Sequence, residues 1–185
     1  MYYKLFEYGV WKTTFNSNLK EFCYKIQSID KGRNASNVNG YQSLDLDKSS
    51  QSLKPLISHI TKETNTYAKN YFSNTTFKLD NMWVNINPTH SYNRIHTHPG
   101  NMFSGVYYIQ TPKNCGNIYF ERPQMDLEES FDWKYNKGTF NSFNSLEWWM
   151  PSTKHICYIF PSYMRHYVES NRSDIDRISI SFNFS

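Results

Sequence analysis

The sequence lacks long apolar runs, dense clusters of charge and paired cysteines, and each absence excludes a class of protein. No apolar run approaches the roughly 18 residues of a membrane-spanning helix. Lys and Arg form no cluster and the formal net charge is only +4, which argues against a nucleic-acid partner. Three cysteines without C-x-x-C spacing favour reduced thiols over a disulfide framework or a zinc cluster. The N-terminal residues do not have the pattern of a secretory signal, so we expect a cytoplasmic protein.

Aromatic residues, by contrast, are abundant. They make up 18 % of the chain, with 15 Tyr and 13 Phe, and both types favour β-strands. A length of 185 residues suits one domain with a proper core. We therefore expect a single domain over residues 1–185, with helical support over 17–72 and a β core over 77–185.

Two segments in the first half carry apolar residues at helical spacing. One runs over residues 19–29 and the other over residues 53–71, where the three-four spacing continues for about five turns. Pro55 falls in the first turn of the second segment, where proline is tolerated. Polar residues just before each segment are expected to cap the two helices.

The second half has the pattern of short strands separated by turns. Residues 177–184 alternate perfectly between apolar and polar, and prolines follow several of the other strands. Two helices followed by at least six short strands favour a mainly β (α+β) sandwich or barrel with the helices on one outer face. Residues 124–153 look like one long irregular loop, with Trp133, Trp148 and Trp149 either forming a substrate lid or packing beneath it.

Two histidines one residue apart are the first candidates for chemistry. His96 and His98 lie just before a strand, and in extended backbone such a pair points to one side, so both imidazoles could hold one metal ion. A His-x-His pair alone is a weak signal. His166 follows a Pro-Ser turn and is the candidate third ligand, which we expect a strand of the opposite sheet to deliver.

The last strand adds a candidate anion site. Arg177 and Ser179 lie on its polar face. If that face looks into a barrel, the guanidinium must be paired, because an unpaired buried charge is very costly. A carboxylate ligand, held bidentately, is one partner, and a nearby acid such as Asp174 is the other.

The order of motifs also resembles a known family. It comprises His-x-His, then "SGVYY", then "GNIYF", then "FPSYMRH" and finally "RISISFN". This series resembles the Fe(II)- and 2-oxoglutarate-dependent oxygenases. It is most similar to a family of such oxygenases of unknown substrate from bacteria and their phages. The resemblance runs from about Trp83 to Phe184 and is specific in combination, although each piece is weak.

The resemblance implies a fold and an activity. The fold would be a double-stranded β-helix, a cupin-like jelly-roll barrel, with two or more N-terminal helices packed on one sheet. The activity would be hydroxylation of a substrate with release of succinate and CO2, using Fe(II) and 2-oxoglutarate. The residues implied are His96 and His166 as catalytic metal ligands, Arg177 and Ser179 for the far carboxylate of 2-oxoglutarate, Tyr108 as a hydrogen-bond donor to it, and Asn85 and Asn93 facing the site.

His98 departs from the expected pattern. The usual non-haem iron site has two histidines and one carboxylate, and the carboxylate would sit where this chain has His98. Three interpretations follow. His98 replaces the carboxylate, which its spacing favours; a distant acid such as Glu121 completes the site; or the protein binds metal without oxygenation.

Two rival functions remain open at this stage. One is a cupin-like, three-histidine dioxygenase or isomerase that does not use 2-oxoglutarate, and it would have no use for Arg177. The other is a non-catalytic jelly-roll binding module, which the fold alone does not exclude. The substrate could be a small molecule or a peptide, nothing points to a membrane partner, and the terminal strand leaves a homodimer open. The resemblance implies the cytoplasm of a bacterium or of a phage host.

Overall fold

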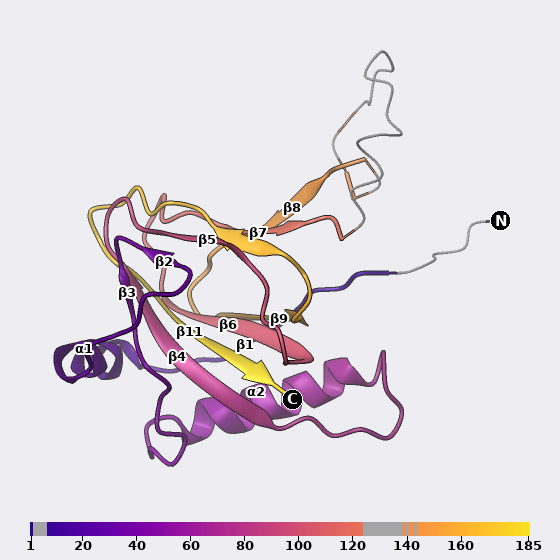
Figure 1. Ribbon diagram of the computed structural model, residues 1–185, viewed down its shortest axis with the longest axis horizontal. Coiled ribbons are helices and arrows are strands. Elements are labelled where there is room, and N and C mark those ends of the chain that lie inside the picture. The colour runs from indigo at the N-terminus through magenta and orange to yellow at the C-terminus, as the bar shows by residue number, and fades with distance from the viewer. Residues whose placement is uncertain (2–6, 124–138, 140, 143) are drawn as a thin grey trace.

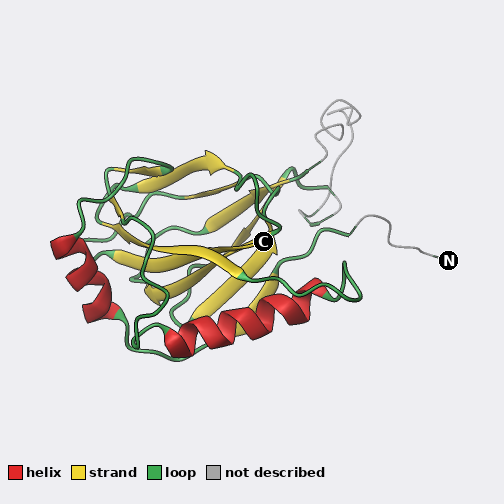
Figure 2. Cartoon of the chain, turned by 60° about the horizontal axis from the view of Figure 1, so that its bottom comes forward, coloured by secondary structure: helices red, strands yellow, loops and turns green. Residues whose placement is uncertain are grey.

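Two antiparallel sheets face each other, and two helices lie against the outside of the larger sheet (Figures 1 and 2). The computed structural model describes residues 1, 7–123, 139, 141–142 and 144–185. Its architecture is a jelly-roll, or double-stranded β-helix, and it confirms the expected mainly β fold with helices on one sheet. Among the described residues, no helix is both long enough and apolar enough to span a membrane.

The larger sheet has six strands in the order β1, β9, β6, β11, β4, β3, and the smaller has five in the order β2, β5, β10, β7, β8. The larger sheet contains Trp11–Thr14 (β1), Tyr41–Gln42 (β3), Leu79–Asn87 (β4), Phe103–Gln110 (β6), Ile156–Pro161 (β9) and Arg177–Phe184 (β11). The smaller sheet contains Asn37–Val38 (β2), Tyr92–His96 (β5), Ile118–Glu121 (β7), Glu147–Met150 (β8) and His166–Val168 (β10).

The two helices form where the apolar spacing predicts them. Helix α1 spans Lys20–Ile29 and α2 spans Lys54–Ala68. The expected polar caps are wrong, because Leu19 and Leu53 occupy the two N-cap positions and neither cap has a side-chain hydrogen bond. Both leucines are buried in the core. Burial of these side chains, rather than capping, therefore accompanies the start of each helix.

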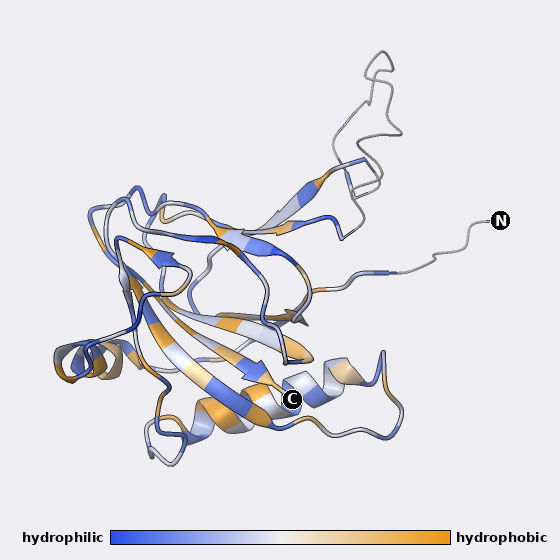
Figure 3. Cartoon of the chain, viewed as in Figure 1, coloured by the Kyte–Doolittle hydropathy of each residue, from blue (hydrophilic) through white to orange (hydrophobic). Residues whose placement is uncertain are grey.

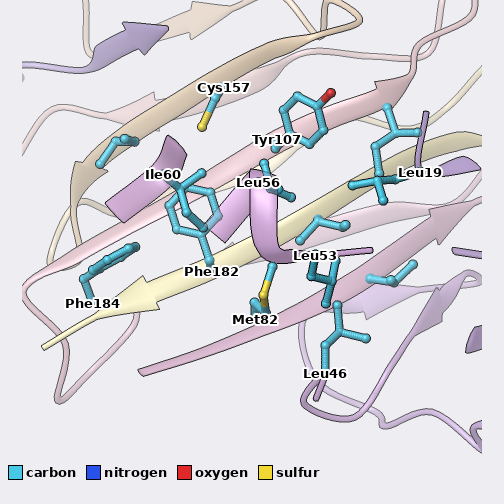
Figure 4. Close-up of a cluster of buried hydrophobic side chains, with 14 of the residues drawn as sticks. Leu19, Leu46, Leu53, Leu56, Ile60, Met82, Tyr107, Cys157, Phe182 and Phe184 are labelled. Atoms are coloured by element: carbon cyan, nitrogen blue, oxygen red, sulfur yellow. The ribbon is translucent and has the colours of Figure 1, made fainter. Parts of the chain in front are cut away.

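Strand β11 has two faces that meet different surroundings. Its apolar residues pack with α2 in the core, where Leu56 and Ile60 are fully buried (Figure 4). The alternation along β4 and β11 is visible in Figure 3. The opposite face of β11, which looks toward the smaller sheet, carries Arg177, Ser179 and Ser181. The larger sheet thus buries an apolar face against the helices and turns a polar face to the space between the sheets.

The structure contains strands where none was predicted. The irregular loop expected over 124–153 contains β8, so Trp148 and Trp149 lie on a strand that pairs with β7. Strand β8 forms by pairing with a strand that is distant in sequence, and no local sequence pattern predicts such a pairing. Trp133, and with it most of the proposed lid, lies outside the described residues. Strand β1 was not expected either, and pairs with β9.

Residues 37–42, which we call the hairpin although β2 and β3 pair with different strands, join the two sheets at one end. Strand β2 pairs with β5 of the smaller sheet, and β3 pairs with β4 of the larger sheet. The hairpin lies on the same side of the molecule as α1 (Figure 1). It therefore contributes backbone and side chains to both sheets close to the space between them.

Candidate metal centre

Three histidines converge between the two sheets. His96 ends β5 and His166 begins β10, and the two are directly opposed across the strand pair. His98 follows two residues after His96 in the connection to β6. One ring nitrogen from each histidine lies within 4.8 Å of the others. Among the described residues, this is the group of histidine, cysteine or acidic side chains whose spacing could hold a metal ion.

The ring orientations leave the metal-facing nitrogens available. His96 Nδ1 lies 2.6 Å from the carbonyl oxygen of Arg94, and His166 Nδ1 lies 2.8 Å from that of Met164. A carbonyl only accepts, so Nδ1 carries the proton in both rings and each Nε2 presents a lone pair. Hydrogen bonds of this kind fix the orientation and tautomer of metal-binding histidines.

The spacing of the rings suits one ion. His98 Nε2 and His166 Nε2 are 3.3 Å apart. Two nitrogens bonded to one ion at about 2.1 Å would stand about 3.0 to 3.4 Å apart, depending on the angle between the bonds. The ring of His98 also stacks on Trp83, with centroids 5.7 Å apart. The distance between the two Nε2 atoms is therefore compatible with both nitrogens binding one metal ion, as well as with a long hydrogen bond.

Burial keeps the three imidazoles neutral. It lowers the pKa of His98 to about 4, with a further contribution from His96. Burial and the two neighbouring histidines hold the pKa of His166 well below its usual value, and burial also lowers the pKa of His96. A metal ion binds the neutral imidazole, so at neutral pH no proton has to leave before binding.

Two expectations about this centre are answered by the topology. His166 does not come from the opposite sheet; it comes from the neighbouring strand of the same sheet as His96. Glu121 does not complete the cluster, because its carboxylate pairs with Arg165 at 2.9 Å. Glu121 follows Phe120 on β7, and Phe120 packs in the core between the sheets, so the alternation of the strand directs Glu121 to the other face.

The three histidines and Arg177 line one small cavity. It has a volume of about 40 Å³. Strand register builds its floor: Ser179 of β11 lies between Asn85 of β4 and Tyr108 of β6, with all three side chains on the inner face. Asn93 of β5 also lines the cavity. The structure thus brings the residues predicted for the metal and the cosubstrate to one cavity, apart from the alternative acid Glu121.

Arg177 is the most unusual residue of this cavity. Its side chain is only 1 % exposed, and Nη1 donates to the carbonyl oxygens of Cys115 and Glu169. Nη2 is buried and has no hydrogen-bond partner among the described residues. The alternative pairing with Asp174 does not occur. Burial lowers the pKa of Arg177, and the charge of Glu169 is among the smaller opposing effects. An arginine stays charged, so the cavity contains a buried cation that forms no ion pair with any described residue.

Two neighbours of Arg177 offer further hydrogen bonds. The hydroxyl of Tyr108 is buried, and none of the described residues provides it with a hydrogen-bond partner. Burial raises its pKa to about 12, against smaller lowerings by Arg177 and by the nearby Ser152 hydroxyl, so the phenol remains a donor at neutral pH. The amide nitrogen of Asn85 donates to Ser181 Oγ at 3.0 Å, and its oxygen likewise has no partner in the described chain. The Tyr108 hydroxyl can donate to a carboxylate together with Arg177, whereas the free oxygen of Asn85 only accepts hydrogen bonds.

Trp83 and Ser181 are cavity residues that the sequence reasoning did not assign to the site. Both occupy inner-face positions of strands whose alternation was recognised, β4 and β11. Extending the alternation from Asn85 to Trp83 and from Ser179 to Ser181 would have found them. The stacking of Trp83 on His98 depends on the connection after β5, and no local pattern predicts that contact.

Fold and site together define a jelly-roll protein with a three-histidine cluster and a buried cation in one cavity. Residues 81–183 match the family described as "Putative 2OG-Fe(II) oxygenase", which is more than half of the chain. The chain belongs to this family of non-haem iron enzymes, whose members use Fe(II) and 2-oxoglutarate. None of the curated proteins matches the chain.

Solved structures agree with the fold. A prolyl-4-hydroxylase from Pseudomonas putida superposes with a TM-score of 0.66 at 12 % identity, covering 96 % of this chain and 92 % of its own. A viral collagen prolyl hydroxylase from Paramecium Bursaria Chlorella virus-1, solved with 2-oxoglutarate, gives 0.60 at 12 % identity, covering 97 % and 96 %. HygX from Streptomyces hygroscopicus, with nickel and 2-oxoglutarate, gives 0.61 at 10 % identity, covering 96 % and 83 %. At these identities the likeness is one of fold.

Proposed function

We propose that this chain is an Fe(II)- and 2-oxoglutarate-dependent dioxygenase that hydroxylates a substrate with release of succinate and CO2. One observation carries the proposal: the three-histidine cluster lines the same cavity as Arg177, whose buried Nη2 has no partner among the described residues. A site with only the histidines would suit many metal proteins. A buried cation facing the same cavity calls for an anionic ligand beside the metal.

The histidines fit iron without a carboxylate. His96, His98 and His166 would each present Nε2, giving three neutral ligands on one side of the ion. Imidazole is a suitable ligand for iron. Three neutral ligands leave the ion with a larger net positive charge than the usual set, and that charge favours anionic groups of the cosubstrate at its remaining positions.

The residues around Arg177 fit the far carboxylate of 2-oxoglutarate. Arg177 Nη2 and the Tyr108 hydroxyl are donors without partners in the described chain, and Ser179 lies between Tyr108 and Asn85. A carboxylate there would satisfy both donors and neutralise the buried charge. Ser179 would add its hydroxyl to the same group. A three-histidine enzyme that does not use 2-oxoglutarate would not need Arg177 Nη2 and the Tyr108 hydroxyl as donors in this cavity.

The protein itself orients the histidine rings and excludes water from the metal site. Phe160 and Phe120 pack against the ring of His166, with centroids 4.7 and 6.0 Å away, and shield it from water. The carbonyls of Arg94 and Met164 hold two rings in one tautomer. When bound, iron and 2-oxoglutarate supply the oxidising chemistry that couples decarboxylation to hydroxylation.

Calorimetry with a substituted arginine tests the proposal. Mn(II)-loaded protein is titrated with 2-oxoglutarate, and Arg177→Gln is compared with Arg172→Gln, which removes the same charge at an exposed loop position. Removing one partner of a buried ion pair costs about 3 kcal/mol or more, so Arg177→Gln should bind at least about a hundredfold more weakly. Arg172→Gln should bind like the wild type. Equal affinity in all three proteins would refute the cosubstrate role of Arg177.

A further inference from the structure

A second, larger hollow lies beside the metal cavity. We call it the hairpin groove; it is lined by residues 31–34, the β2–β3 hairpin residues 37–42, and Arg94, and has a volume of about 490 Å³. The connection before β2 borders both spaces, since Ser36 lines the metal cavity while Arg33 and Asn34 line the groove. The metal cavity itself is small, at about 40 Å³, and iron with 2-oxoglutarate would fill it. The bulk of a substrate would therefore have to lie outside it.

The floor of the groove contains buried acceptors. Gln42 is 5 % exposed and Asn37 is 8 % exposed, and their side-chain oxygens, Oε1 and Oδ1 respectively, have no hydrogen-bond partner among the described residues. Leaving a buried polar atom without a hydrogen-bond partner is energetically unfavourable. Two such atoms lining one groove therefore point to a ligand that donates hydrogen bonds to them.

The rim of the groove is positively charged. Lys31 and Arg94 are exposed and form no ion pair with any described residue, while Arg33 pairs with Asp45 at 2.9 Å. The residues that line the groove include no Asp or Glu, and the nearby Asp30 carboxylate accepts from the backbone N–H groups of Gly32 and Leu44. Two such cations at the edge of a polar hollow favour an anionic ligand.

Two contacts join the groove to the metal cluster. The guanidinium of Arg33 lies 5.2 Å from the ring centroid of Trp83, and Trp83 stacks on His98. The backbone carbonyl of Arg94 accepts from Nδ1 of His96. A ligand in the groove would therefore contact residues that themselves touch two of the three candidate metal ligands.

We propose that the hairpin groove binds the anionic part of the enzyme's substrate, a carboxylate- or phosphate-bearing molecule that also carries hydroxyl or N–H donors. The proposal rests on the proposed function, because it treats the groove as the substrate subsite of that metal centre. Lys31 and Arg94 bind the anionic group, and the oxygens of Gln42 and Asn37 accept from its donors. The remainder of the substrate reaches past Ser36 toward the histidines.

Paramagnetic broadening of a small anion tests the subsite. Protein loaded with Mn(II) and saturated with 2-oxoglutarate is mixed with inorganic phosphate, observed by ³¹P resonance, or with acetate, observed by its methyl protons. Zn(II)-loaded protein provides the diamagnetic reference. The test variant is the double substitution Lys31→Gln/Arg94→Gln. Its matched control is Lys62→Gln/Lys69→Gln, which removes two exposed charges at and just beyond the C-terminal half of α2.

The expected result is saturable broadening of at least one anion in the wild type and the control, with about tenfold weaker affinity in the test variant. Broadening of phosphate alone or of acetate alone supports the subsite and tells which anionic group the groove prefers. Broadening that is equal in both double variants, or absent for both anions, overturns the subsite. Failure of 2-oxoglutarate to bind the same wild-type sample overturns the proposed function instead, and is measured separately by calorimetry.

Discussion

Replacing His98 with Gln should make the metal-free protein less sensitive to acid. Burial lowers the pKa of His98 to about 4 in the folded protein, whereas in the unfolded chain the pKa is near the ordinary histidine value of 6.5. Between these values the unfolded chain binds more protons than the folded one, so the free energy of unfolding falls as the pH falls. The stabilisation is complete above pH 6.5 and is lost progressively toward pH 4. Glutamine does not titrate and removes this loss.

The magnitude follows from the difference between the folded and unfolded pKa values. A pKa difference of one corresponds to about 1.4 kcal/mol, so the His98 contribution lost between pH 7 and pH 4 is about 3 kcal/mol. Substitution also relieves the effect of His98 on the pKa of His166, which acts in the same direction. Urea unfolding at several pH values, with chelator present throughout, would measure this difference between variant and wild type.

His90→Gln is the matched control, because His90 is exposed in a turn outside the cluster. The control should follow the wild-type pH dependence. If His98→Gln loses as much stability between pH 7 and pH 4 as the wild type, then His98 is not a desolvated member of a neutral cluster.

Three further substitutions have clear expected outcomes. Tyr108→Phe removes a hydroxyl that no described residue pairs with, so the apo-protein should keep its unfolding free energy while calorimetry shows about tenfold weaker binding of 2-oxoglutarate. Gly105→Ala would place Cβ against the ring of Phe182 and 2.7 Å from the carbonyl oxygen of Tyr158, so urea unfolding should show a loss of about 3 kcal/mol. Ile60→Ala opens a cavity at a fully buried position beneath the sheet and should cost about 2–5 kcal/mol, with unchanged 2-oxoglutarate affinity.

Much of the fold could be predicted from local patterns. The alternation in β11 separates the apolar residues that pack on α2 from the polar residues of the cavity, because successive side chains of a strand point to opposite faces. The same rule places Asn85 and Tyr108 beside Ser179 once the register is known. Apolar spacing predicted both helices correctly, but the buried leucines Leu19 and Leu53 occupy the N-cap positions where polar residues were expected.

The remaining features depend on long-range pairing. His166 was expected from the opposite sheet, and only the pairing of β10 with β5 shows that it shares a sheet with His96. Strand β8 forms by pairing with β7, so a segment without a strong local pattern became ordered. The hairpin groove is formed by a loop, a hairpin and Arg94 of β5, which lies more than fifty positions from the hairpin in sequence. No single stretch contains that information.

The most direct test of the central claim is an anaerobic titration of the apo-protein with Fe(II) and then 2-oxoglutarate, followed by visible absorption. Our account predicts a charge-transfer band that requires both components, that is lost in His166→Ala and that is weakened in Arg177→Gln. Iron binding with a spectrum that 2-oxoglutarate does not change would contradict the account and favour a cosubstrate-free three-histidine enzyme. Absence of iron binding would contradict it more deeply and favour a non-catalytic binding module.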